Sequence, residues 1–139
     1  MKIVVVSGGF DPIHSGHIAY FKSAKKLGDK LIVALNSDKW LINKKGKFFM
    51  PFEERSTIIK NLAMVDEVID FEDDEFGSAS HALIKIKESY PNNEIIFCNG
   101  GDRTEQNIPE MQIEDINFEF GVGGEDKNNS SSWILKNVQ

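Results

Sequence analysis

Short apolar runs recur along the chain and are separated by longer stretches of mixed polarity. They occupy residues 3–6, 31–35, 65–71, 95–98 and 116–120 and are rich in Ile, Val and Phe. Apolar, β-branched runs of this length are typical of strands buried on both faces of a parallel sheet. The first four runs therefore predict strands, and residues 116–120 are a candidate for a fifth.

The segment between the first two predicted strands has the spacing of an amphipathic helix. Ile18, Phe21, Ala24 and Leu27 recur every three residues, and the pattern stops before Gly28. Glycine is common just past a helix end, and lysines in the last turn favour the negative end of the helix dipole. The first crossover between strands is therefore predicted to be helical.

Two further helices are predicted between the later strands. Pro51 followed by Glu53 and Glu54 is a favourable helix start, and Ser78 or Ser80 can cap the next helix. Strands and helices then alternate along the chain. This alternation predicts an α/β fold, a Rossmann-like parallel five-stranded sheet flanked by helices.

Two long stretches, residues 36–50 and 99–115, are expected to be irregular. Loops of this length are uncommon in a small domain unless they carry function. Both follow predicted strands, and open parallel sheets bind ligands beyond the carboxyl ends of their strands. A ligand site is therefore expected at that edge.

Size and composition narrow the classes of function. The chain of 139 residues fits one domain over residues 1–139, and its net charge of -6 argues against broad binding to nucleic acid or to acidic membranes. We expect a cytoplasmic protein, because the chain leads directly into its first strand without an export signal. The single cysteine, Cys98, excludes an internal disulfide and lies in a predicted buried strand.

The segment after the first strand carries the most informative chemistry. Gly8 and Gly9 end the strand, and His14, Gly16 and His17 stand where the first helix begins. A glycine turn before a helix presents backbone N–H groups and a positive dipole end, which suits phosphate. Imidazoles there can donate to phosphate oxygens, whereas the plainer interpretation is that both histidines only cap the helix.

Other side chains near the predicted edge have both a functional and a plain interpretation. Phe10 and Asp11 follow the glycines, and an Asp-Pro pair commonly begins a turn. Lys44, Lys45 and Lys47 surround a glycine in the stretch after the second strand. They could close over a triphosphate or form a solvated surface cluster.

Three sites elsewhere could join them. Arg55, one turn into the second helix, would ordinarily be a surface residue. Gly100 and Asp102 follow the fourth strand, where Gly-Gly-Asp is also an ordinary tight turn. Three consecutive hydroxyls near the end of the chain offer a helix cap or a phosphate site. They are Ser130, Ser131 and Ser132.

The segment 10–17, with its preceding strand and glycine turn, resembles the HxGH signature of the nucleotidyltransferase superfamily and its cytidylyltransferase-like family. The resemblance implies that His14, His17, Lys44 and Arg55 act in catalysis. It implies nucleotide contacts from Gly8, Gly9, Phe10, Asp11, Gly16, Lys47, Gly100, Asp102, Ser130, Ser131 and Ser132. Arg103 is the candidate for the acceptor phosphate.

Over its whole length the chain resembles two branches of this family, the glycerol-3-phosphate cytidylyltransferases and the adenylyltransferase domain of heptose-phosphate enzymes. Residues 36–38 and 100–102 favour the heptose type, whereas chain length and the spacing from Lys44 to Arg55 suit the glycerol-phosphate type. Basic residues of the glycerol-phosphate branch are replaced by Ala63 and by residues 125–128. The acceptor therefore stays open.

The resemblance implies transfer of CMP from CTP to a sugar-phosphate or polyol-phosphate, with release of pyrophosphate and with Mg²⁺ carried by the triphosphate. The product would serve as a precursor for a surface polysaccharide, and a homodimer is implied. An ATP-dependent enzyme acting on a heptose-type phosphate is the alternative within the family. A nucleotide-binding protein without turnover is the alternative from another class.

Overall fold

The computed structural model describes residues 1–99 and 109–122. Its sheet has five parallel strands in the order β3-β2-β1-β4-β5. The strands are β1 (Lys2–Gly8), β2 (Lys30–Leu35), β3 (Glu67–Ile69), β4 (Glu94–Cys98) and β5 (Asn117–Glu119). The predicted Rossmann-like parallel sheet is therefore confirmed, and all five apolar runs contain a strand.

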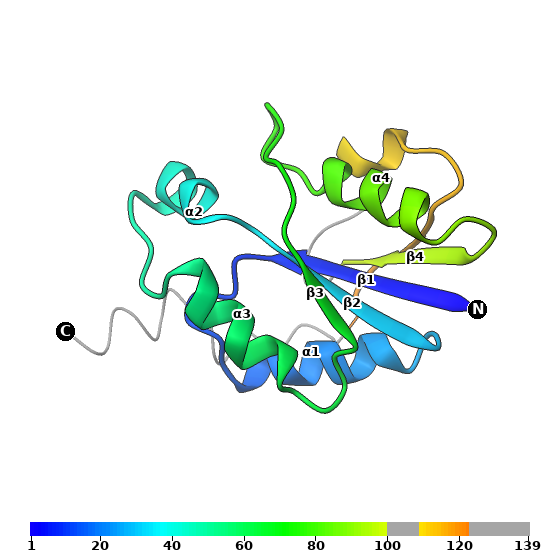
Figure 1. The fold of residues 1–139 in the computed structure, drawn as a ribbon, viewed down its shortest axis with the longest axis horizontal. Coiled ribbons are helices and arrows are strands. Elements are labelled where there is room, and N and C mark those ends of the chain that lie inside the picture. Colours follow the sequence, from blue (N-terminus) through cyan, green and yellow to red (C-terminus); the bar gives the residue numbers. More distant parts are fainter. Residues whose placement is uncertain (100–108, 123–139) are drawn as a thin grey trace.

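Helices cover both faces of this sheet (Figure 1). One face packs against α1 (Ser15–Lys25) and α3 (Phe52–Lys60), with Phe21 and Ile59 fully buried between helix and sheet. The other face packs against α4 (Ser80–Ser89) through Leu83 and Ile86. The short 3₁₀ helix η1 (Pro109–Gln112) lies beside α4. Because helices cover both faces of the sheet, strand residues that point to either side are apolar.

Residues 36–50 differ from the prediction, because they contain a helix. Ser37 caps α2 (Asp38–Lys45), its hydroxyl accepting the Trp40 N–H at 3.0 Å, and Gly46 ends the helix with φ 85°. A left-handed residue after a helix is commonly glycine. In Figure 1, α2 stands beyond the carboxyl ends of β1 and β2, so it forms part of the ligand edge.

The start of α4 also differs in detail from the prediction. Its N-cap is Ala79, not a serine, and the carboxylate of Glu110 accepts the Ala79 N–H at 2.8 Å. Ser78 contributes through its hydroxyl, which accepts the Ser80 N–H at 3.2 Å. Two segments distant in sequence therefore cap this helix together.

No helix in the described ranges is long and apolar enough to cross a membrane. That residues 1–139 form a single domain stays a prediction, as does the cytoplasmic location.

Candidate functional site

The site begins where β1 ends at Gly8 and Gly9 follows it. A Cβ atom on Gly8 would meet the Phe10 ring at 2.8 Å, and one on Gly9 would meet Leu41 Cδ2 at 2.6 Å. The Phe10 ring packs edge-on against His17, with centroids 4.9 Å apart. The turn therefore packs closely against α2 and against its own aromatic residue, with little room for a side chain at either glycine.

His14 and His17 both cap the start of α1. His14 Nδ1 accepts the Gly16 N–H at 3.0 Å, and His17 Nδ1 accepts the His14 N–H at 3.2 Å. This reciprocal pair forms a capping box. The two rings stack with centroids 3.8 Å apart. Both histidines therefore cap the helix, and the cap uses only one nitrogen of each ring.

The remaining nitrogens follow from the tautomer. Because each Nδ1 accepts a hydrogen bond, a neutral ring carries its proton on Nε2. Burial, followed by the positive charges of His14 and Lys45, lowers the pKa of His17 to about 3, and burial also lowers the pKa of His14. Both rings are therefore neutral near pH 7 and act as N–H donors.

His17 borders a pocket of about 240 Å³ at the carboxyl edge of the sheet, whereas His14 is not among the lining residues. Its walls come from the glycine turn, the end of β2, α2 and the start of α4. The lining residues are Ser7, Gly8, Gly9, Phe10, His17, Asn36, Trp40, Leu41, Lys44, Lys45, Gly77, Ala79 and Glu110. The predicted convergence of chain segments on this edge is thus present.

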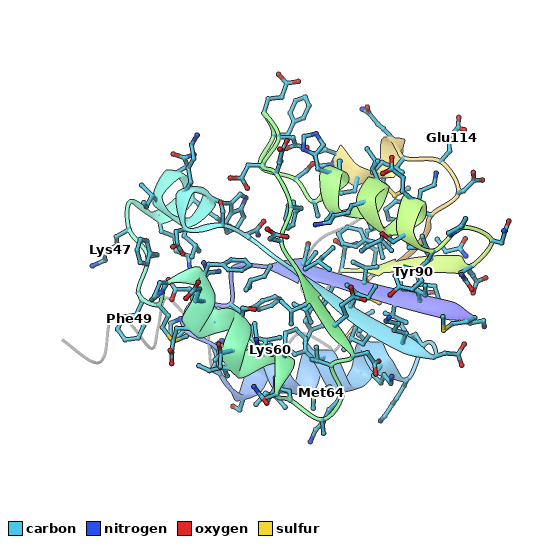
Figure 2. The ribbon with its side chains drawn as sticks, in the orientation of Figure 1. Lys47, Phe49, Lys60, Met64, Tyr90 and Glu114 are labelled. Atoms are coloured by element: carbon cyan, nitrogen blue, oxygen red, sulfur yellow. The ribbon has the colours of Figure 1, made fainter. Side chains whose placement is uncertain are left out.

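The three lysines are placed differently. Lys44 and Lys45 lie in the last turn of α2 and line the pocket, and the Lys44 ammonium lies 4.6 Å from the centre of the Trp40 ring. Lys47 projects from the outer edge of the loop between α2 and α3 (Figure 2). Two of the three cations therefore line the pocket together with His17.

Asp11 and Arg55 lie behind the pocket instead of in its wall. Asp11 is 1% exposed, and both its carboxylate oxygens accept backbone N–H groups, from Phe49 and Met50. Arg55 is fully buried and donates to backbone carbonyls and to Asp38. The implied nucleotide contacts of both side chains stay predictions, and their geometry is that of structural anchors.

Sequence reasoning missed Glu110 and the position of Trp40. Glu110 is 1% exposed and lines the pocket. Glu110 lies in a polar stretch of the sequence, where nothing distinguishes a buried glutamate from one on the surface. From the sequence, Trp40 could be a surface contact, a core residue or a ligand-loop residue; in the structure its indole N–H donates to the Gly77 carbonyl at 2.9 Å. Tryptophan is expected to find such a partner when its ring is partly buried.

A larger and shallower cleft of about 670 Å³ adjoins the pocket. The two share Trp40, Lys44 and Gly77. The rest of the cleft comes from Asn43 and from an acidic and aromatic loop, residues 73–76. Phe76 at its rim is 70% exposed. The two hollows together could hold a ligand with two parts.

Several predicted site residues lie outside the described residues. They are Gly100, Asp102, Arg103, Ser130, Ser131 and Ser132. Within the described ranges, no group of three or more His, Cys, Asp or Glu side chains could hold a metal ion. The pocket wall there instead provides lysines, an imidazole and a glycine turn, a set that suits phosphate.

Comparisons with known proteins identify the family. The family model "Cytidylyltransferase-like" matches residues 5–135. The bifunctional protein HldE of Enterobacter sp. is 34% identical over 99% of this chain, and a Salmonella arizonae HldE is 33% identical. The chain spans only 28% of the length of these relatives.

Solved structures share the fold. A lipopolysaccharide core biosynthesis protein from Thermoplasma volcanium has a TM-score of 0.67 and 27% identity, covering 86% of this chain and 95% of its own. A putative nicotinate-nucleotide adenylyltransferase from Vibrio parahaemolyticus also has a TM-score of 0.67, at 17% identity, with 97% and 84% covered. Given the family match along nearly its whole length, the chain belongs to the cytidylyltransferase-like family of nucleotidyltransferases.

Proposed function

We propose that this protein transfers a nucleoside monophosphate from a triphosphate to a sugar phosphate and releases pyrophosphate. One observation carries the proposal: neutral imidazoles, whose Nε2–H groups the helix cap does not use, stand beside a glycine turn and two pocket-lining lysines. Among the described residues, no group of three or more His, Cys, Asp or Glu side chains could hold a metal ion. The set suits stabilisation of phosphate charge.

Such a reaction needs positioning and charge stabilisation but no covalent nucleophile on the protein. A phosphate oxygen of the acceptor attacks the α-phosphorus, and the bond from that phosphorus to the bridging oxygen of pyrophosphate breaks. His14 and His17 donate to the α-phosphate as its charge grows. Lys44 and Lys45 neutralise the departing pyrophosphate. Mg²⁺ bound with the triphosphate would supply further neutralisation.

ATP is the nucleotide that we propose, in place of the CTP expected from the sequence. The support is the similarity to HldE proteins over 99% of this chain, added to the resemblance of residues 36–38 and 100–102 to the heptose-phosphate adenylyltransferases. The family name alone favours CTP. CTP therefore remains the second nucleotide to test.

The acceptor that we propose is a heptose-type sugar phosphate, placed in the cleft next to the pocket. Support comes from the shared walls of the two hollows, because Trp40 and Lys44 border both. Carboxylates of the 73–76 loop can accept hydrogen bonds from sugar hydroxyls, and aromatic side chains can pack on the sugar ring. Dimer formation and Mg²⁺ dependence stay predictions.

The test is pyrophosphate release with Mg²⁺, with ATP or CTP, and with a panel of heptose, glycerol, ribitol and erythritol phosphates. We expect release with ATP and a heptose phosphate. His17→Asn should abolish release, because Asn keeps the acceptor for the His14 N–H but lacks a donor at Nε2. Release with CTP and a polyol phosphate would reject the choice of substrates. Nucleotide binding without release from any pair would favour a binding protein.

A further inference from the structure

Asp11 and Arg55 are withdrawn from the pocket, and both bind the same residue. Asp11 Oδ1 accepts the Met50 N–H at 2.6 Å, and Arg55 Nε donates to the Met50 carbonyl at 2.9 Å. Asp11 Oδ2 also accepts the Phe49 N–H at 2.6 Å. The end of the loop between α2 and α3 is therefore held through both polar groups of one peptide residue. We name Asp11, Met50 and Arg55 the Met50 clamp.

Arg55 connects the Met50 clamp to the rest of the site. Its Nη1 donates to the carbonyls of Gly9 and Asn36, each at 2.8 Å. Its Nη2 forms an ion pair at 2.7 Å with Asp38, the first residue of α2. One buried guanidinium thus ties the glycine turn, the end of β2, and both ends of the segment that carries the pocket lysines.

Helix α2, which carries the pocket lysines, depends on these contacts with Arg55 to stay in place. In α2 only Leu41 is buried, so the helix gains little from packing. Trp40 and Ser37 add single hydrogen bonds to the loop near Gly77 and Asp73. Short helices depend on tertiary contacts for their stability. Loosening the Met50 clamp would therefore free α2 to move relative to α1 and its imidazoles.

We propose that Asp11 and Arg55 are positioning residues that hold Lys44 and Lys45 in register with His14 and His17. The proposal rests on the proposed function, in which these lysines bind a triphosphate. Arg55 then acts on the nucleotide only through α2. A lysine at position 55 keeps the charge but cannot reach all of the carbonyls that the planar guanidinium joins.

A first experiment measures the segment without any substrate. Trypsin cleavage after Lys44, Lys45 and Lys47 is followed by mass spectrometry in the native protein. Arg55→Lys and Asp11→Asn should raise the cleavage rate roughly tenfold, the expected effect of losing one or two buried hydrogen bonds. Asp70→Asn removes an exposed ion pair with Lys85 and should leave the rate unchanged.

A second experiment uses a double-mutant cycle on the binding of ATP and CTP, measured by calorimetry. Lys44→Met is made in the wild-type and the Arg55→Lys background. If Arg55 acts by positioning Lys44, the weakening caused by Lys44→Met should be roughly tenfold in the wild type and much smaller in the Arg55→Lys background, since coupled residues are not additive. Leu83→Ala, which destabilises the opposite face, should remain additive with Lys44→Met.

The outcomes separate the two proposals. Faster cleavage with non-additive binding supports the positioning role. Nucleotide binding with additive effects, or unchanged cleavage in both clamp variants, overturns the positioning role and leaves the proposed function standing. If wild-type protein binds neither ATP nor CTP, the proposed function fails, and the positioning role as stated fails with it.

Discussion

Acid should destabilise the fold through His17. Burial, with the charges of His14 and Lys45, lowers the pKa of this imidazole to about 3, whereas a histidine in the unfolded chain titrates near about 6.5. Below that value the unfolded chain binds a proton that the folded protein does not bind. The free energy of unfolding therefore falls as the pH drops from about 6.5, and this loss ends near pH 3.

The size of the effect follows from the slope of one proton, about 1.4 kcal/mol per pH unit. Between about pH 6.5 and about pH 5 a single histidine of this kind loses roughly 1.6 kcal/mol. His14, whose pKa is also lowered, acts in the same direction. The loss is a measurable part of a typical domain stability of about 5–15 kcal/mol.

Urea unfolding of the wild type and of His17→Asn, each at about pH 6.5 and about pH 5, measures how much His17 contributes to this loss of stability. The Asn side chain can accept the His14 N–H in place of Nδ1, so the variant should fold and should lose roughly 1.6 kcal/mol less than the wild type on acidification. His81→Asn controls for removal of a histidine on the surface. Equal losses in the wild type and His17→Asn would refute the reasoning.

Three further predictions test the pocket and its surroundings. Gly9→Ala should lower stability by about 1–3 kcal/mol, seen in the melting temperature, because its Cβ would meet Leu41 Cδ2 at 2.6 Å. Burial raises the pKa of Cys98 to about 12, so iodoacetamide should alkylate it far more slowly in native protein than in urea. Glu110→Ala should cost about 1–3 kcal/mol by leaving the Ala79 N–H unpaired, whereas Glu110→Gln should retain most of the stability in urea titrations.

The sheet could be predicted because its signal is strong and local. Runs such as residues 3–6 and 95–98 are apolar along their length, and their burial on both faces leaves few alternatives. The position of the site followed from topology, since ligand loops gather where parallel strands end. The histidine pair was found because its spacing fixes both residues at one helix end.

Helix α2 was missed because its signal lies in its caps and not in its apolar pattern. Only Leu41 of the helix is buried, so no apolar stripe marks it. Ser37 before the segment and Gly46 after it were visible as start and stop signals. Reading those two residues together would have predicted a short helix and placed Lys44 and Lys45 in its last turn.

The direction of a charged side chain could not be predicted in the same way. Lys44 and Arg55 are both cations near the same edge, yet one lines the pocket and the other is fully buried. What separates them is the supply of acceptors: Gly9, Asn36 and Met50 turn their carbonyls inward toward position 55. A guanidinium can serve several carbonyls at once, whereas an ammonium on a flexible stem cannot match that arrangement. The family resemblance therefore draws attention to Arg55, and only the three-dimensional placement of those carbonyls explains why its side chain is buried.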